Sequence, residues 1–264
     1  MCSLRRTLIA IAACLALLAP VPASAEADVE RLMEWLGISA AARQADRIIG
    51  QNLRLLSQPP AGEALSDEQQ QYLHSKLSAA TGADTVLANT RAYIAQHLPV
   101  SSAKAERILM EPLAVRARNF DVAMEMAGSF EKFQSFTEQL QDNPPPEQRR
   151  ALLRRLDNAL RSSAIAALLQ TEIEITSRLA AARLSDTSKP FQDNRLSSHR
   201  QAQRRQYMAE VAMQLNLFSY RYMQDEELSQ YIALLEDSSI QELLDISEQG
   251  LLQGLEAGRA IALQ

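Results

Sequence analysis

Glu147 to Leu184 reads EQRRALLRRLDNALRSSAIAALLQTEIEITSRLAAARL, and this stretch decides the fold. Its apolar side chains recur every three or four positions, as on one face of a helix, and do not alternate as in a strand. The recurring residues are Leu152, Leu153, Leu156, Leu160, Ala164, Ala167, Leu168, Ile175 and Leu179. This stretch therefore predicts helix, and the rest of the chain follows the same pattern.

Prolines mark the breaks between the expected helices, because proline lacks the N–H that a helix interior requires. No segment alternates apolar and polar residues, and aromatic residues make up only 5% of the chain, so strands are not expected. The sequence predicts an all-α fold, an antiparallel multi-helix bundle. We expect helices at 28–36, 40–56, 66–80, 84–97, 102–127 (with a kink or a new start at Pro112), 128–141, 147–184, 198–223, 226–235 and 240–262, and a loop at 185–197.

Residues 1–25 have the features of a secretory signal peptide. Arg5 and Arg6 precede an apolar run from Thr7 to Ala19, and Ala23-Ser24-Ala25 supplies the small residues of a cleavage site. We expect export to the periplasm and cleavage after Ala25.

Both cysteines, Cys2 and Cys14, lie in this segment, so the mature chain would hold no disulfide and no cysteine nucleophile or metal ligand. Ile11-Ala12-Ala13-Cys14 loosely resembles a lipobox, which makes a lipoprotein the alternative. The apolar run is short before Cys14 and continues after it, which favours cleavage after Ala25.

The triple proline, Pro144 to Pro146, predicts a stiff linker at 143–146 between an N-terminal half, 26–142, and a C-terminal half, 147–264. Similar residues recur at a spacing of about 125. Arg31-Leu32-x-x-x-Leu36 matches Arg155-Leu156-x-x-x-Leu160, and Leu109-Met110-Glu111 matches Leu234-Leu235-Glu236. Two interpretations fit this pattern: two related helical halves packed together, or one bundle whose helices match by chance.

Signatures of catalysis and of metal binding are missing from the sequence. His74, His97 and His199 have no second ligand at the spacing of a metal site, and neither GxSxG, SxxK nor HExxH occurs. We therefore predict no cofactor, no metal site and no identifiable catalytic residue. Two carboxylates brought together by folding would be the remaining route to an enzyme.

Charge is unevenly distributed along the chain. Removing Arg5 and Arg6 with the signal peptide changes the formal net charge from −5 to −7, which gives no overall attraction to nucleic acid. Nine acidic residues follow position 224, against the single basic residue Arg259. Two basic clusters precede them, one of Arg149, Arg150, Arg154, Arg155 and Arg161 and one of Arg195, Arg200, Arg204 and Arg205.

Two interpretations of these clusters remain open. The acidic C-terminal region packs beside the basic helices, or the arginines form a basic groove for an anionic ligand or a membrane surface. Phe218, Tyr220 and Tyr222 alternate in sequence, so a single helix face cannot bury all of them. The candidate binding residues are therefore Arg149, Arg150, Arg154, Arg200, Arg204, Tyr220 and Tyr222.

Gly250, Gly254 and Gly258 lie four residues apart on the last expected helix. This spacing places them on one face, where the missing side chains let another backbone approach closely. We expect close packing within the chain, with a homodimer seam as the alternative.

The segment Tyr222-Met223-Gln224-Asp225-Glu226-Glu227-Leu228, with Tyr231 to Ser238 after it, resembles a family of secreted helical proteins of Gram-negative bacteria, domain of unknown function 2059. In that family an aromatic residue precedes a capped Glu-Glu-Leu helix start, and an apolar pair precedes Ser-Pro-x-Gly. Leu234 and Leu235 stand at the apolar pair, but neither proline nor glycine follows Ser238. The resemblance implies a periplasmic all-helical domain and brings no catalytic residues.

We therefore expect a non-enzymatic periplasmic protein that binds a ligand or a partner in the cell envelope, such as an envelope protein or an anionic ligand. The alternatives are a hydrolase of an envelope polymer that uses converging carboxylates, and a peripheral protein of the membrane surface.

Overall fold

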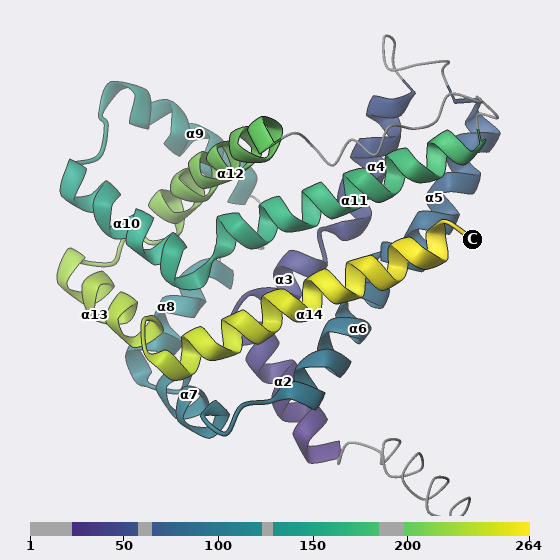
Figure 1. Ribbon diagram of the computed structural model, residues 1–264. Coiled ribbons are helices and arrows are strands. Elements are labelled where there is room, and N and C mark those ends of the chain that lie inside the picture. The colour runs from purple at the N-terminus through teal and green to yellow at the C-terminus, as the bar shows by residue number, and fades with distance from the viewer. Residues whose placement is uncertain (1–22, 58–64, 123–128, 185–197) are drawn as a thin grey trace, which may run out of the picture.

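The computed structural model describes residues 23–57, 65–122, 129–184 and 198–264, and every regular element in these ranges is an α-helix (Figure 1). The all-α fold predicted from the apolar periodicity is thereby confirmed. Most of the expected signal peptide (residues 1–22) and the expected loop at 185–197 lie outside the described residues, while Ala23 already belongs to the first described helix.

Before the triple proline, the helix limits follow capping and glycine signals. Ser66 caps its helix by accepting a hydrogen bond from the Gln69 backbone N–H, and the Gln69 side chain accepts one from the Ser66 N–H in return. The helices are α2 (Ala23–Trp35), α3 (Ile38–Ala42), α4 (Ala45–Leu56), α5 (Asp67–Thr81), α6 (Ala83–His97), α7 (Ser102–Leu109), α8 (Pro112–Val122) and α9 (Ser129–Asp142).

Pro112 is the first residue of α8, so it starts a helix and does not kink one. The predicted helix at 40–56 is divided, because Arg43 and Gln44 separate α3 from α4.

After the triple proline the structure contains α10 (Glu147–Leu160), α11 (Ser162–Leu184), α12 (Ser198–Ser219), α13 (Asp225–Leu235) and α14 (Ser238–Ala262). The periodicity of 147–184 gave no sign of the break at Arg161, which has the left-handed φ of 57°. The Asp157 carboxylate stabilises the new start by accepting hydrogen bonds from the Ser163 backbone N–H at 2.9 Å and from its hydroxyl.

The break at Arg161 has a counterpart in the first half. Gly37 has a φ of 74° and precedes α3, and it lies 124 residues before Arg161, which precedes α11. In the described ranges these are the two residues with positive φ. This correspondence is what two related helical halves would produce.

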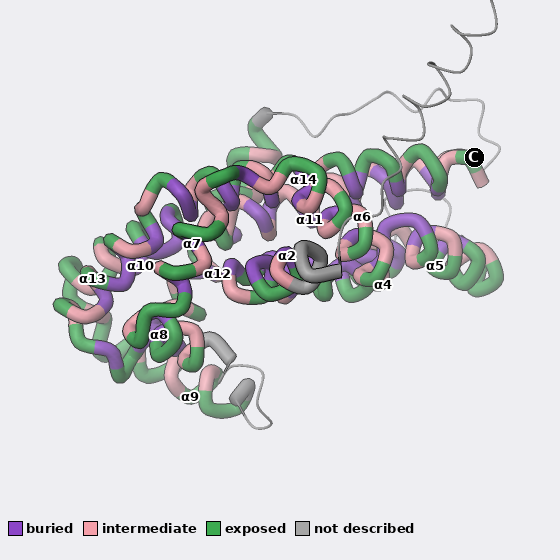
Figure 2. Tube along the Cα trace, turned by 90° about the horizontal axis from the view of Figure 1, so that it is seen from below, coloured by how far each residue is buried: buried purple, intermediate pink, exposed green. Residues whose placement is uncertain are grey.

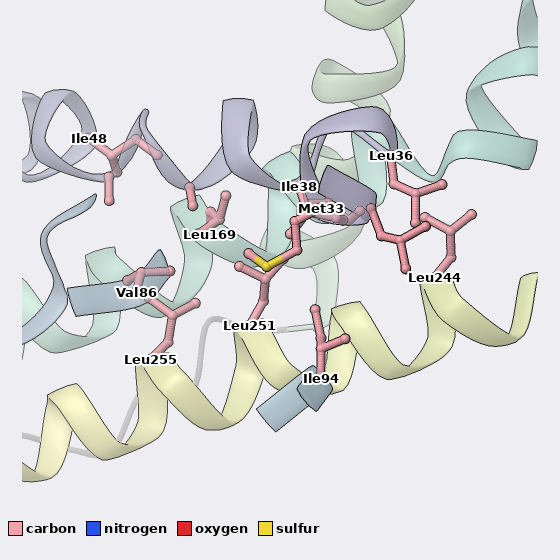
Figure 3. Packing of buried hydrophobic residues seen from close by; sticks show 14 of the residues in the cluster. Met33, Leu36, Ile38, Ile48, Val86, Ile94, Leu169, Leu244, Leu251 and Leu255 are labelled. Carbon is pink, nitrogen blue, oxygen red and sulfur yellow. The ribbon is translucent and has the colours of Figure 1, made fainter. Parts of the chain in front are cut away.

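The core is one continuous cluster to which both halves contribute. Figure 3 shows Leu251 and Leu255 of α14 packed among Met33 of α2, Val86 of α6 and Leu169 of α11. α11 also packs on α4 and α5, and α14 packs on α5, α6 and α7. The two halves are therefore interleaved and do not form separate bodies.

The long helices α11 and α14 run side by side in the same direction, from the end where α10 and α13 lie to the end where α5 lies (Figure 1). α8 and α9 lie at the opposite end of the molecule from α4 and α5 (Figure 2). Buried and exposed segments alternate along the helices in this view, as amphipathic helices require.

The glycine face of α14 is covered by α5 and α6. A Cβ atom at Gly250 would lie 3.1 Å from Tyr93, and one at Gly254 would lie 3.1 Å from Asn89. At Gly258 it would lie 2.1 Å from the carbonyl oxygen of Ala80, a distance no side chain tolerates. Gly250 faces Tyr93, whereas Gly254, further along α14, faces Asn89, which comes earlier in α6. These two helices are therefore antiparallel. The structure places this face inside the chain, which leaves no room there for the alternative homodimer seam.

Candidate functional site

The arginines of the first basic cluster contact acidic residues of the C-terminal region. Arg149 donates to the Asp225 carboxylate at 2.6 Å and to the Tyr220 carbonyl at 2.5 Å, and its side chain is 12% exposed. Arg155 pairs with Glu236, and Arg161 pairs with Asp245 and Glu248. These three arginines therefore connect α10 and its C-terminal end to the segments of α13 and α14.

The other two members of this cluster, Arg150 and Arg154, pair with Glu147 at the start of their own helix. Both side chains are about half exposed. The cluster thus does not converge on a common groove.

The two candidate tyrosines have opposite environments. Tyr220 is fully buried, near the rings of Phe120 and Tyr231. Tyr222 is 71% exposed, and the guanidinium of Arg221 lies 4.5 Å from the centre of its ring. Arg200 is exposed near the start of α12.

Two candidates line hollows of the surface: Tyr222 lines an open one of about 550 Å³ beside α9, and Arg204 lines a more enclosed one. The pocket that Arg204 lines lies between α4, α11 and α12 and has a volume of about 320 Å³, at the small end of the range of ligand sites. The pocket is lined by Ile48, Gln51, Asn52, Leu55 and Leu56 of α4, Gln170, Glu174 and Arg178 of α11, and Arg204 of α12.

Glu174 connects two arginines at one side of this pocket. Its Oε1 accepts a hydrogen bond from Arg178 Nε at 2.8 Å, and its Oε2 accepts one from Arg204. Arg204 also donates to the Thr171 hydroxyl at 3.1 Å, which fixes the guanidinium against α11. The Glu174 and Arg204 side chains are 14% and 19% exposed, so solvent screens this network only partly. With two arginines and one carboxylate, the lining carries a net charge of +1.

The rest of the pocket combines amides with an apolar wall. Ile48, Leu55 and Leu56 form the wall, and Leu55 is 63% exposed although it is a large apolar side chain. The Nδ2 of Asn52 is buried and has no hydrogen-bond partner among the described residues. This atom is covered by the protein, so it is not one of the donors that a ligand in the pocket would meet.

Sequence reasoning identified Arg204 but missed Glu174, Arg178 and Asn52. Glu174 and Arg178 are four residues apart on one helix, which is a recognisable pairing in the sequence. The packing of α4 and α12 beside that pair is a tertiary feature, and no local sequence pattern predicts it.

A second hollow, of about 230 Å³, lies between α11, α12 and α14 and contains the carboxylates Glu172 and Glu248. Burial raises the pKa of Glu172 above its ordinary value, against the opposing effect of its ion pair with Arg259. Glu248 pairs with Arg161. Both carboxylates thus already have arginine partners, which gives the carboxylate hydrolase no specific support.

The described residues contain no group of three or more His, Cys, Asp or Glu side chains that could hold a metal ion. In the same part of the chain no helix combines the length and apolarity needed to cross a bilayer.

Comparisons of the chain with models of protein families, with curated proteins and with solved structures found no match. The functional argument therefore depends on the geometry of the site.

Proposed function

We propose that this protein is an exported, non-enzymatic binding protein that holds a small ligand in the pocket between α4, α11 and α12. One observation carries the proposal: a concave site in which an apolar wall faces a partly buried arginine–glutamate–arginine network. Ligand sites in proteins combine these two kinds of surface, one for affinity and one for orientation.

The chemistry of the lining supports binding over catalysis. Its one carboxylate, Glu174, accepts hydrogen bonds from two arginines, which disfavours a role as a general base. Among the described residues that line the pocket, none is a histidine, lysine, cysteine, serine or tyrosine that could act as a nucleophile.

The N-terminal segment supports the location. Arg5 and Arg6, the apolar run to Ala19 and the cleavage pattern at Ala23-Ser24-Ala25 indicate export to the periplasm. The resemblance of the region around Tyr222 to secreted helical proteins points the same way.

The proposal is tested by titrating the full exported protein with a panel of small metabolites while following backbone NMR shifts. We expect at least one compound to shift residues of α4, α11 and α12 together. A panel without such a response, or shifts confined to other helices, would contradict the proposal.

A matched pair of variants controls this experiment. Gln51→Trp places a large ring at the exposed rim of the pocket and should abolish the response, whereas Gln71→Trp makes the same change at an exposed position of α5 and should preserve it. Fractionation of the producing cells tests the location, and N-terminal sequencing tests cleavage after Ala25.

A further inference from the structure

We infer that the ligand of this pocket is a small amphipathic carboxylate, in which one carboxyl group is joined to a short unbranched apolar chain. The inference rests on the proposed function, and it names the class of ligand that the pocket would accept.

The polar side of the pocket offers more donors than acceptors. Arg178 and Arg204 each have several N–H groups, and Glu174 is the one carboxylate available to them in the lining. A ligand that satisfies these groups must bring acceptor oxygens and, with a net charge of +1 in the lining, a negative charge.

Glu174 shows which anion suits the arginines. Its two carboxylate oxygens are divided between Arg178 and Arg204, so a planar carboxylate already fits between these two guanidinium groups. A ligand carboxylate would join this network from the pocket side and share the same donors. This geometry favours a carboxylate over a bulkier tetrahedral anion.

The apolar wall accounts for the second part of the ligand. Leu55 exposes 63% of its surface to solvent at the rim, and Ile48 and Leu56 continue the wall inward. Covering this surface with a hydrocarbon chain removes apolar area from water, which favours binding. A volume of about 320 Å³ limits the occupant to one short chain and excludes a two-chain lipid.

The test uses octanoate as the probe, with octanol, acetate and octyl phosphate as comparison ligands, each titrated into the full protein by NMR. We expect octanoate to shift α4, α11 and α12. Octanol lacks the charge and acetate lacks the chain, so both should bind about tenfold more weakly or worse.

Three variants test whether octanoate binding depends on the charged side chains of the pocket. Arg178→Gln removes a 42% exposed arginine and should weaken octanoate binding about tenfold. Glu174→Gln removes the competing carboxylate and should strengthen it severalfold. Arg150→Gln, which changes an exposed arginine of α10, is the control and should have no effect. Thermal melts show that each variant is folded, and Arg178→Gln keeps the test decisive if Glu174→Gln unfolds.

The outcomes distinguish this inference from the proposed function. Equal binding of octanol and octanoate, or tighter binding of octyl phosphate, would overturn the carboxylate assignment while the pocket remained a binding site. The same holds if octanoate fails while another metabolite shifts α4, α11 and α12. If no compound of the panel shifts residues of α4, α11 and α12, both the ligand class and the proposed binding function are overturned.

Discussion

At the scale of single residues, two helical glycines predict opposite responses to alanine. A Cβ atom at Gly258 would lie 2.1 Å from the Ala80 carbonyl oxygen, whereas one at Gly50 would have no atom within 4 Å. Gly258→Ala should therefore lower the free energy of unfolding by about 2–3 kcal/mol, because α14 and α5 must move apart. Gly50→Ala should raise it by about 0.5–1 kcal/mol, because alanine stabilises a helix interior.

Urea denaturation of both variants measures these changes. A Gly258→Ala protein as stable as the wild type would show that α14 does not pack closely on α5.

Asp237 predicts a dependence of stability on pH. It caps α14 by accepting a hydrogen bond from the Ser239 backbone N–H at 3.0 Å, and it pairs with Lys104 at 2.7 Å. The hydrogen bond from Lys104, together with those from Ser239, lowers the pKa of Asp237 from 3.8 to about 2. Because the pKa is lower in the folded state, this stabilisation is present above about pH 4 and is lost as the pH falls towards 2.

Asp237→Ala should cost about 1–2 kcal/mol at neutral pH, as the loss of a helix cap does, and the difference from the wild type should shrink between pH 4 and pH 2. Urea denaturation across this pH range measures it. Asp142→Ala, at an exposed position at the end of α9, is the control and should change stability by less than about 0.5 kcal/mol. A cost at Asp237 that stays constant down to pH 2 would contradict the prediction.

At the scale of elements, Arg149 connects α10 to the end of α12 and to the start of α13. Arg149 is largely buried and bonds to Asp225 and to the Tyr220 carbonyl, whereas Arg150 is about half exposed and pairs with Glu147 one turn away. Arg149→Ala leaves a carboxylate and a buried carbonyl with fewer partners, and it should cost about 2–3 kcal/mol. Arg150→Ala is the matched control and should cost less than about 0.5 kcal/mol.

Chemical denaturation of the two variants compares them directly. Equal costs at the two positions would mean that the contact of Arg149 is no stronger than a surface ion pair.

At the scale of the whole molecule, the interleaved core predicts that neither half folds alone. The glycine face of α14 packs on α5 and α6, and α11 packs on α4 and α5. Each half would therefore expose a broad apolar surface to water if the other half were absent. Fragments 26–142 and 147–264, produced separately, should lack cooperative thermal unfolding, and mixing or coexpression should restore it. Circular dichroism melts provide the measurement, and a cooperative transition in either isolated fragment would contradict the prediction.

The pocket also belongs to this scale. Its wall comes from α4 in the first half, and its charged side comes from α11 and α12 in the second. Spacing within one helix could reveal the Glu174–Arg178 pair, but the approach of Arg204 and Asn52 joins residues far apart in the chain. The sequence therefore pointed to one residue of the pocket lining, Arg204, and gave no sign of its neighbours.

The sequence by itself determined that the chain is helical, that Ser66 begins a helix and that three glycines share one face of the last helix. Each of these depends on neighbours within a few residues, where backbone hydrogen bonding and side-chain spacing act directly. Only the tertiary structure decided that Arg161 breaks the long helical stretch, that Arg149 is bound to Asp225 and that the glycine face is covered by α5 and α6. These features depend on which helices lie together. The amphipathic pattern predicts which face of a helix is buried, but it does not predict which other helix covers that face.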